Sequence, residues 1–165
     1  MPAAWDTTTA ARLRPDSPVL DHAREHRRAG DPIAFTATTL KEISHGLHKA
    51  AASGRQAAGA QLRWLRDQID AGLVEVLAFD DRAADVAGAL RAALPTPPST
   101  LRRPRARSKP DNGVAWILDI QIAATVFANG YDLLTADAHH PIIATQLAAL
   151  APTAPPLRIH PPPRL

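Results

Sequence analysis

Cysteine is absent from the 165 residues of the sequence. Its absence excludes a disulfide framework, a zinc site built on thiolates, an iron–sulfur cluster and a cysteine nucleophile. A chain of this length can bury a full hydrophobic core without such links, and its content of 45% hydrophobic and 21% charged residues is typical of globular proteins. We therefore expect a single domain over residues 1–165.

Three longer patterns are also missing. No run approaches the ~20 apolar residues of a membrane span. The N-terminal segment MPAAWDTTTAARL has no basic stretch followed by an apolar one, so it does not resemble a secretory signal. The absence of a glycine-rich phosphate loop disfavours a nucleotide-binding enzyme. A cytoplasmic protein without membrane contact is expected.

Lysine is scarce, because only Lys41, Lys49 and Lys109 accompany the arginines in a chain of net charge +3. This mild positive charge permits an anionic partner without requiring one. Arginine suits phosphate binding. An excess of arginine, alanine and proline is also what GC-rich coding produces, and we favour that explanation.

The 16 prolines are unevenly distributed along the chain. A first group predicts a basic, proline-rich surface loop over residues 94–113, since proline neither continues a helix nor joins a central strand. A second group predicts a proline-rich tail over residues 151–165, with one short strand at 157–160.

The rest of the chain alternates between short apolar runs and longer segments of helical periodicity. Strands are expected at 33–36, 73–77 and 132–135, with a weaker strand at 3–5 because alanine is a poor strand former. Helices are expected at 40–52, 56–71, 81–93, 114–128 and 138–149. This alternation predicts an α/β fold with a parallel sheet.

Four carboxylates fall at or just past the predicted strand ends, where open α/β sheets bind their ligands. They are Asp6, Glu42, Asp119 and Asp137. Three of them also have a purely structural interpretation. Asp6 and Asp137 are natural helix N-caps, and the run Thr39-Leu40-Lys41-Glu42 has the pattern of a capping box.

Asp119 has no such alternative, because it lies within the strongly apolar stretch WILDIQIAATVF. A lone carboxylate there must be paired or must bind a cation, since unpaired burial costs several kcal/mol. Four clustered carboxylates stay ionised together only if a cation neutralises them. Ligation by oxygen alone favours Mg²⁺ or Mn²⁺, and such sites commonly serve phosphoryl chemistry.

The order of these motifs resembles that of PIN-domain ribonucleases, and specifically of the VapC-type toxins of bacterial toxin–antitoxin pairs. The matching segments are Asp6-Thr7 after the first strand, IAFTATTLKEISHGL with Glu42 and Gly46, LDIQIAATVFANG with Asp119, Ile122, Ala123 and Ala124, and GYDLLTADAHH with Gly130, Leu133, Thr135 and Asp137. The last two motifs are the most specific, and the match spans the chain in the family's order.

The resemblance implies a PIN-like three-layer fold with a central parallel sheet flanked by helices. It implies a Mg²⁺-dependent endoribonuclease, with Mn²⁺ as a second choice of cation, that leaves 5′-phosphate and 3′-hydroxyl ends without a covalent intermediate. Asp6, Glu42, Asp119 and Asp137 would be its catalytic metal ligands, supported by Thr7 and Thr135. The partners it implies are an RNA substrate, a small antitoxin that blocks the carboxylates, and a second copy in a homodimer.

Two departures from the family pattern leave alternatives open. The first strand, MPAAW, lacks the usual large apolar residues, so a PIN-fold protein that binds RNA or a partner but has weakened catalysis is one alternative. A PIN nuclease of RNA processing outside any toxin pair is another. The loop over residues 94–113 is longer and more basic than the family pattern.

That loop holds five basic residues that precede the helix of Asp119. They are Arg102, Arg103, Arg105, Arg107 and Lys109. They either contact the RNA backbone or form a solvated loop, and the second interpretation is slightly favoured.

Histidine chemistry is disfavoured by the sequence pattern. Glu42, His45 and His48 have the spacing of a di-iron element, but no second such element exists in the sequence. The pair His139-His140 could approach a bound phosphate, although a polar helix start is the favoured interpretation.

Overall fold

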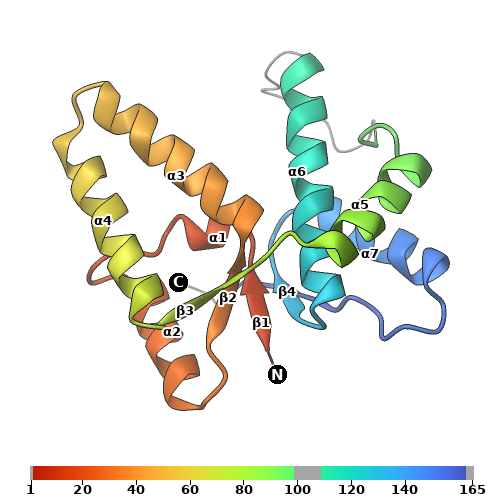
Figure 1. The fold of residues 1–165 in the computed structure, drawn as a ribbon, viewed down its shortest axis with the longest axis horizontal. Coiled ribbons are helices and arrows are strands. Elements are labelled where there is room, and N and C mark those ends of the chain that lie inside the picture. Colours follow the sequence, from red (N-terminus) through yellow and green to blue (C-terminus); the bar gives the residue numbers. More distant parts are fainter. Residues whose placement is uncertain (1, 99–108, 163–165) are drawn as a thin grey trace.

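The computed structural model describes residues 2–98 and 109–162, with side chains from residue 113 onward in the second segment. Figure 1 shows a central sheet with helices on both sides. The elements in chain order are β1 (Ala3–Trp5), α1 (Thr7–Ala10), α2 (Pro18–Arg28), β2 (Ile33–Thr36), α3 (Ala37–Ala52), α4 (Gln56–Asp70), β3 (Val74–Leu77), α5 (Asp81–Ala93), α6 (Lys109–Ala128), β4 (Asp132–Leu134), α7 (His139–Leu150) and β5 (Ile159–His160).

The five strands form one sheet in the order β3-β2-β1-β4-β5, and every described pair is parallel. The chain adds β2 and β3 on one side of β1 and then crosses over to add β4 and β5 on the other. The strand order therefore reverses between β1 and β4. In open parallel sheets this switch point is where ligands bind, beyond the carboxyl ends of the strands.

Alternation along the central strands sorts the core into two layers. Ala3 and Trp5 of β1 belong to the hydrophobic cluster that includes residues of α2, α3 and α4, whereas Ala4 belongs to the cluster of α5, α6 and α7. In Figure 1 these two groups of helices lie on opposite sides of the sheet. The expected α/β class with a parallel sheet between helical layers is confirmed.

The weakly predicted first strand is fully formed. Its residues Ala3–Trp5 are buried and pair with both β2 and β4. Ala4 stands in register with Ala34, and both small side chains face the layer that Trp116 of α6 fills. Burial at the centre of the sheet thus outweighs the low strand propensity of alanine.

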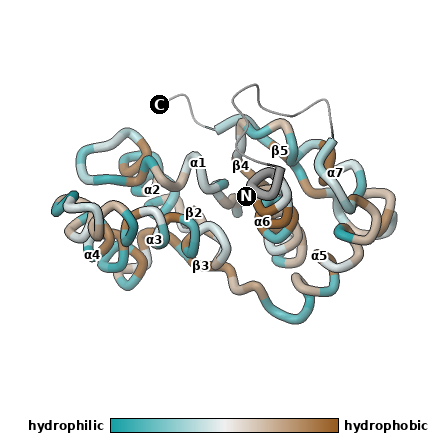
Figure 2. The backbone as a smooth tube through the Cα atoms, turned by 90° about the horizontal axis from the view of Figure 1, so that it is seen from above, coloured by the Kyte–Doolittle hydropathy of each residue, from teal (hydrophilic) through white to brown (hydrophobic). Residues whose placement is uncertain are grey.

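Helix α6 is longer than its apolar pattern predicts. It begins at Lys109 rather than Val114, so residues 109–113 of the expected loop are helical. Pro110 is tolerated as its second residue, since the N–H groups of the first turn have no partner inside the helix. Asp119 is consequently the eleventh residue of the helix rather than part of its first turns. Figure 2 shows α6 as one of the most hydrophobic segments of the chain.

Two further boundaries differ from the expectations by two or more residues. Helix α3 begins at Ala37 instead of residue 40, and β5 covers only Ile159–His160 instead of 157–160. Helix α2 was not expected at all. It begins after Ser17, whose hydroxyl accepts from the Leu20 N–H, and Pro18 is its first residue.

No helix within the described ranges is long and apolar enough to cross a membrane.

A half-buried histidine on α2, His22, gives a prediction for stability. The His22 ring stacks on the buried Trp5, with ring centroids 5.9 Å apart, and its Nε2 atom is buried without a hydrogen-bond partner. Burial, reinforced by the nearby His26 and opposed by Glu25, lowers the pKa of His22 below its ordinary value of 6.5. The unfolded chain therefore takes up a proton at higher pH than the folded chain does.

It follows that acidification through this range favours the unfolded state. We expect the free energy of unfolding to fall as the pH drops from about 7 to about 5, and to fall less in His22→Gln. Urea unfolding at several pH values measures this slope. His48→Gln, an exposed histidine on α3, should keep the slope of the unsubstituted protein. Equal slopes in the protein and in His22→Gln would contradict the assignment.

Candidate metal centre

Asp6 lies at the carboxyl end of β1 and is buried, with 3% of its surface exposed. It is the N-cap of α1, as expected, because its Oδ1 accepts from the Thr9 N–H at 2.8 Å. Its other oxygen, Oδ2, accepts from the Thr135 hydroxyl at 2.7 Å. Each carboxylate oxygen can accept a second partner, so the cap and the hydrogen bond leave Asp6 able to ligate a cation.

Thr135, at the end of the neighbouring strand β4, ties the site together. Its hydroxyl donates to Asp6, accepts from the Asp137 backbone N–H at 2.9 Å, and lies 3.3 Å from His140 Nδ1. A hydroxyl has one proton to give, and here Asp6 takes it. Nδ1 of His140 is therefore the donor in the third contact. Thr135, predicted as a supporting polar residue, thus contacts both the Asp6 side chain and the Asp137 backbone.

His140 is buried with 1% exposure, and its Nε2 atom has no hydrogen-bond partner. Burial lowers the pKa of His140, against the opposite effect of Asp119, Asp137 and Asp6. If the ring proton is on Nδ1, Nε2 carries no proton and is the nitrogen that is buried without a partner. His140 thus holds the Thr135 hydroxyl in place through the contact with Nδ1.

Asp137 lies between β4 and α7. The N-cap of α7 is Ala138, so the expectation that Asp137 is the cap is wrong by one residue. Its carboxylate nevertheless satisfies the start of the helix, because Oδ1 accepts from the His139 N–H at 2.9 Å. This bond and the Thr135 contact to its backbone fix the direction of the Asp137 side chain.

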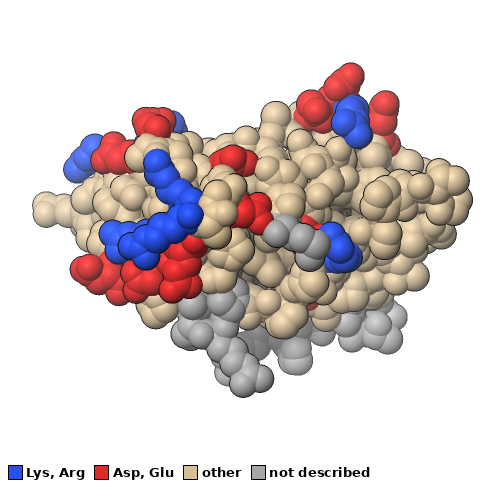
Figure 3. Space-filling model, turned by 90° about the horizontal axis from the view of Figure 1, so that it is seen from below, with Lys and Arg blue, Asp and Glu red and all other residues tan. Residues whose placement is uncertain are grey.

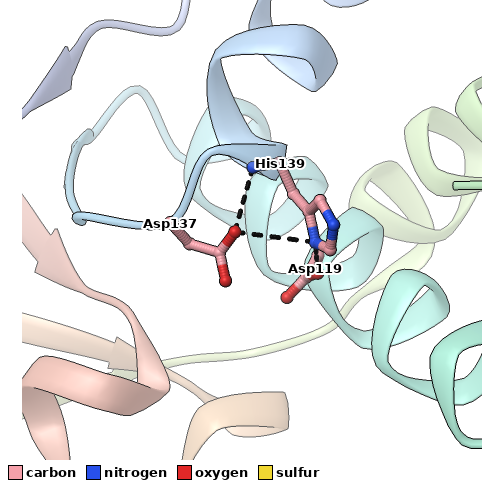
Figure 4. Close-up of side chains that lie close together, drawn as sticks. All are labelled: Asp119, Asp137 and His139. Atoms are coloured by element: carbon pink, nitrogen blue, oxygen red, sulfur yellow. Dashed lines mark hydrogen bonds and ion pairs between the residues drawn. The ribbon is translucent and has the colours of Figure 1, made fainter. Parts of the chain in front are cut away.

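Asp119 of α6 and Asp137 both lie close to Nδ1 of His139 (Figure 4). Nδ1 of His139 lies 2.6 Å from Asp119 Oδ2 and 3.6 Å from Asp137 Oδ1. One ligand atom from each of the three residues lies within 4.8 Å of the others. The three residues are partly buried and could hold a metal ion. His139 is the member of this group that the sequence analysis did not assign to the site.

Glu42, on α3, is linked to the residue that follows Asp6. Its Oε2 accepts from the Thr7 hydroxyl at 2.5 Å, and Thr7 directly follows Asp6. The expected capping box is wrong: the N-cap of α3 is Thr36, whose hydroxyl accepts from the Thr39 N–H. Glu42 is the sixth residue of α3. It therefore has no capping role, which leaves its carboxylate available to the site.

A hollow of about 130 Å³ opens beside these carboxylates. Asp6 and Asp137 contribute acidic groups to its wall, and Arg12 contributes a basic one. Thr8 and Pro162 line it as well. An anionic group held in this hollow would lie near the carboxylates while facing a guanidinium.

The side chains of the basic residues predicted to contact RNA are not among the described ones. Arg102, Arg103, Arg105 and Arg107 lie outside the described residues, and of Lys109 only the backbone, at the start of α6, is described. Their assignment stays a prediction.

The sequence matches no protein-family model and no curated protein. Solved structures similar to this one include three that match over nearly the whole of both chains. VapBC2 from Rickettsia felis, bound to a DNA fragment from their promoter, has 16% identity, 98% coverage of each chain and a TM-score of 0.58. DNA-bound VapBC from Salmonella typhimurium has 19% identity, 98% coverage of each chain and a TM-score of 0.56. FitAcB from Neisseria gonorrhoeae has 18% identity, 99% coverage of each chain and a TM-score of 0.55.

At these identities the likeness establishes the fold. The expected PIN-like architecture is confirmed by it together with the parallel sheet and its flanking helices. The donor set of the site fits a divalent cation, because two carboxylates and an imidazole lie within reach of one another. Asp6 joins them through Thr135.

Proposed function

We propose that this protein is a metal-dependent endoribonuclease and the toxin of a toxin–antitoxin pair. The observation that carries the proposal is the acidic cluster beside the point where the strand order reverses. Asp119 and Asp137 belong to a group that could hold a metal ion, and Asp6 is linked to Asp137 through Thr135. The Thr135 hydroxyl holds two of these residues in one hydrogen-bonded unit. The family resemblance of the sequence and the VapBC and FitAcB folds support the same function.

Asp6, Glu42, Asp119 and Asp137 would hold the cation, with Mg²⁺ or Mn²⁺ as the candidates. A bound divalent ion supplies Lewis acidity, activating the attacking water and stabilising the leaving oxygen of the phosphodiester. Thr135 orients Asp6, and Thr7 orients Glu42. The products expected from in-line hydrolysis are a 5′-phosphate and a 3′-hydroxyl.

The structure bears on the alternative that this is a PIN-fold protein with weakened catalysis. That alternative rested on a first strand too weak to position Asp6. The strand is formed, buried and paired on both sides, and Asp6 donates its own N–H to Leu134 O at 3.2 Å. Asp6 is therefore held by backbone and side-chain contacts alike.

An antitoxin partner is supported by the neighbours, since the similar chains come from structures of VapBC, VapBC2 and FitAcB. A cluster of carboxylates suits a partner's arginine, which pairs with carboxylates bidentately. We propose that the antitoxin blocks the site with such a residue. A homodimer and a cytoplasmic location stay predictions from the sequence.

Expression with and without the neighbouring small gene tests the toxin assignment. We expect the chain alone to arrest growth and to produce new RNA ends, and the co-expressed small protein to suppress both. New RNA ends without growth arrest or suppression would favour a nuclease of RNA processing. The absence of new ends would contradict the nuclease assignment.

Arg12 is a cation beside the site that could contact the RNA backbone. On the face shown in Figure 3, basic side chains on the side of α2 to α4 lie interleaved with acidic ones. The ion pair of Arg24 with Asp21 on α2 is an example of this mixing. Arg12 instead lies on the wall of the hollow that Asp6 and Asp137 share.

Arg12→Gln is therefore expected to weaken RNA binding and to reduce its salt dependence. Loss of one phosphate contact on single-stranded RNA should lower the slope of log affinity against log salt by roughly 0.7. Affinities measured at several salt concentrations in an Asp119→Asn background, which prevents cleavage, give this slope. Arg66→Gln, an exposed arginine on α4, is the matched control. Equal slopes for the two variants would remove Arg12 from the substrate site.

A further inference from the structure

The position of His139 bears on which metal the site takes. Its Nδ1 lies 2.6 Å from Asp119 Oδ2 and 3.6 Å from Asp137 Oδ1. The two carboxylates come from different elements, α6 and the segment before α7. Figure 4 shows the Nδ1 atom of the ring in contact with both of them. A nitrogen donor therefore stands among the oxygen donors that the sequence predicts.

The ring is held in this position from two sides. Its backbone N–H is bound by Asp137, which fixes the start of the side chain. The fully buried Trp116 contacts the ring edge to face, with centroids 5.2 Å apart and planes at 82°. Trp116 is itself anchored, because its Nε1 donates to Leu94 O at 3.0 Å. Little rotamer freedom remains to be lost when the ring takes up a ligand.

We propose that His139 ligates the cation through Nδ1, making the centre a mixed nitrogen and oxygen site. Such a site prefers a first-row transition ion, for which Mn²⁺ is the probe, over Mg²⁺. Mg²⁺ requires near-ideal octahedral geometry and oxygen ligands, whereas imidazole suits transition ions. This inference rests on the proposed function, because it concerns the same cation.

The geometry agrees with direct ligation. Adjacent ligands of an octahedral ion at about 2.1 Å lie roughly 3 Å apart. The two distances from Nδ1, 2.6 and 3.6 Å, bracket this separation. When the cation binds, its bonds to His139 and Asp119 replace the hydrogen bond between these two residues. The ring proton is then on Nε2, so that the lone pair of Nδ1 can bind the cation. The proposal therefore replaces the expected site of oxygen ligands alone with a site of oxygen ligands and one nitrogen ligand.

The test uses the purified full chain without RNA. Pulsed electron paramagnetic resonance of bound Mn²⁺ should show coupling to a nitrogen nucleus, and this coupling should vanish in His139→Gln. Equilibrium dialysis should show Mn²⁺ affinity reduced by about 10- to 100-fold in His139→Gln, in the range seen when groups around a metal are altered. Mg²⁺ affinity should change by less than about threefold. His48→Gln, on the exposed surface of α3, should behave as the unsubstituted protein.

Two outcomes would overturn the inference. One is bound Mn²⁺ without nitrogen coupling in the unsubstituted protein, a result that depends on no variant. The other is an equal loss of Mn²⁺ and Mg²⁺ affinity in His139→Gln, which would make His139 a positioning residue for Asp119. In both cases Asp119→Asn would still abolish metal binding if the proposed function holds. If neither Mn²⁺ nor Mg²⁺ bound the unsubstituted protein, the inference and the proposed metal dependence would be overturned together.

Discussion

Asp119→Asn is expected to leave the fold intact and to reduce RNA cleavage by roughly 100-fold or more. The asparagine keeps the shape of the side chain but removes the charge that faces His139 and Asp137. Loss of one preorganised electrostatic group at a reacting centre typically costs about 100- to 1,000-fold in rate. Cleavage rates with Mg²⁺ and with Mn²⁺, compared with the unsubstituted protein, measure the effect.

Thermal unfolding separates this loss from misfolding. A bound cation stabilises the folded state in proportion to its affinity, so metal should raise the Tm of the protein and leave that of Asp119→Asn unchanged. Without metal, the Tm of the variant should be equal or higher, because one of several like charges is gone. Asp85→Asn, an exposed carboxylate on α5, is the control and should cleave normally. Full cleavage by a folded Asp119→Asn protein would remove Asp119 from the site.

Thr135→Val is expected to have the second largest effect, on stability and cleavage together. Valine keeps the shape but removes a buried hydroxyl that contacts Asp6, the Asp137 N–H and His140. A hydrogen bond to a charged group is worth about 1.5–3 kcal/mol, and buried groups left without a partner add to the loss. We expect the free energy of unfolding to fall by about 2–4 kcal/mol, as measured by urea unfolding.

The same variant tests whether Thr135 also positions the site. Metal affinity should fall, because Asp6 and the Asp137 backbone lose their common partner, and Thr135→Ser should restore both properties. Thr145→Val, an exposed threonine on α7, should change neither. A variant that is destabilised but binds metal normally would give Thr135 a structural role alone. Unfolding within about 0.5 kcal/mol of the unsubstituted protein would contradict the hydrogen-bonded unit itself.

Local sequence patterns predict the regular elements of this chain well where a turn residue bounds an apolar run. Strand β2 follows Pro32 and covers 33–36 as predicted, and α5 covers 81–93 as predicted. Strand β1 is different. Its alanines have little strand propensity, and only the motif that follows them indicates a strand, because its stability comes from two neighbouring strands far along the chain.

Helix α2 shows how charge can hide an amphipathic pattern. Its buried residues Val19, Leu20 and Ala23 form a narrow stripe among charged side chains. The start signals were nevertheless present, since Ser17 before Pro18 is a typical helix N-terminus. The opposite error occurred in α3, where Thr39 and Glu42 match a capping box although Thr36 already caps the helix.

Asp6 and Asp137 were predictable because they follow strands, and parallel strands end at one edge of the sheet. Asp119, inside α6, was predictable from its apolar surroundings. The place of His139 was not predictable in this way. Its contact with Asp119 joins residues 20 positions apart in sequence that lie on two different helices. That contact depends on the packing of α6 against α7 and on the edge of Trp116, and no local spacing encodes either.

The most direct test of a metal-dependent endoribonuclease is the chemistry of the RNA ends that the purified chain produces. A defined single-stranded RNA is incubated with the protein and a divalent cation, with and without excess EDTA, and the ends are analysed. The account predicts cleavage only when the cation is available, with 5′-phosphate and 3′-hydroxyl ends, and none by Asp119→Asn. Cleavage that persists in EDTA, or that leaves 2′,3′-cyclic phosphate ends, would contradict it.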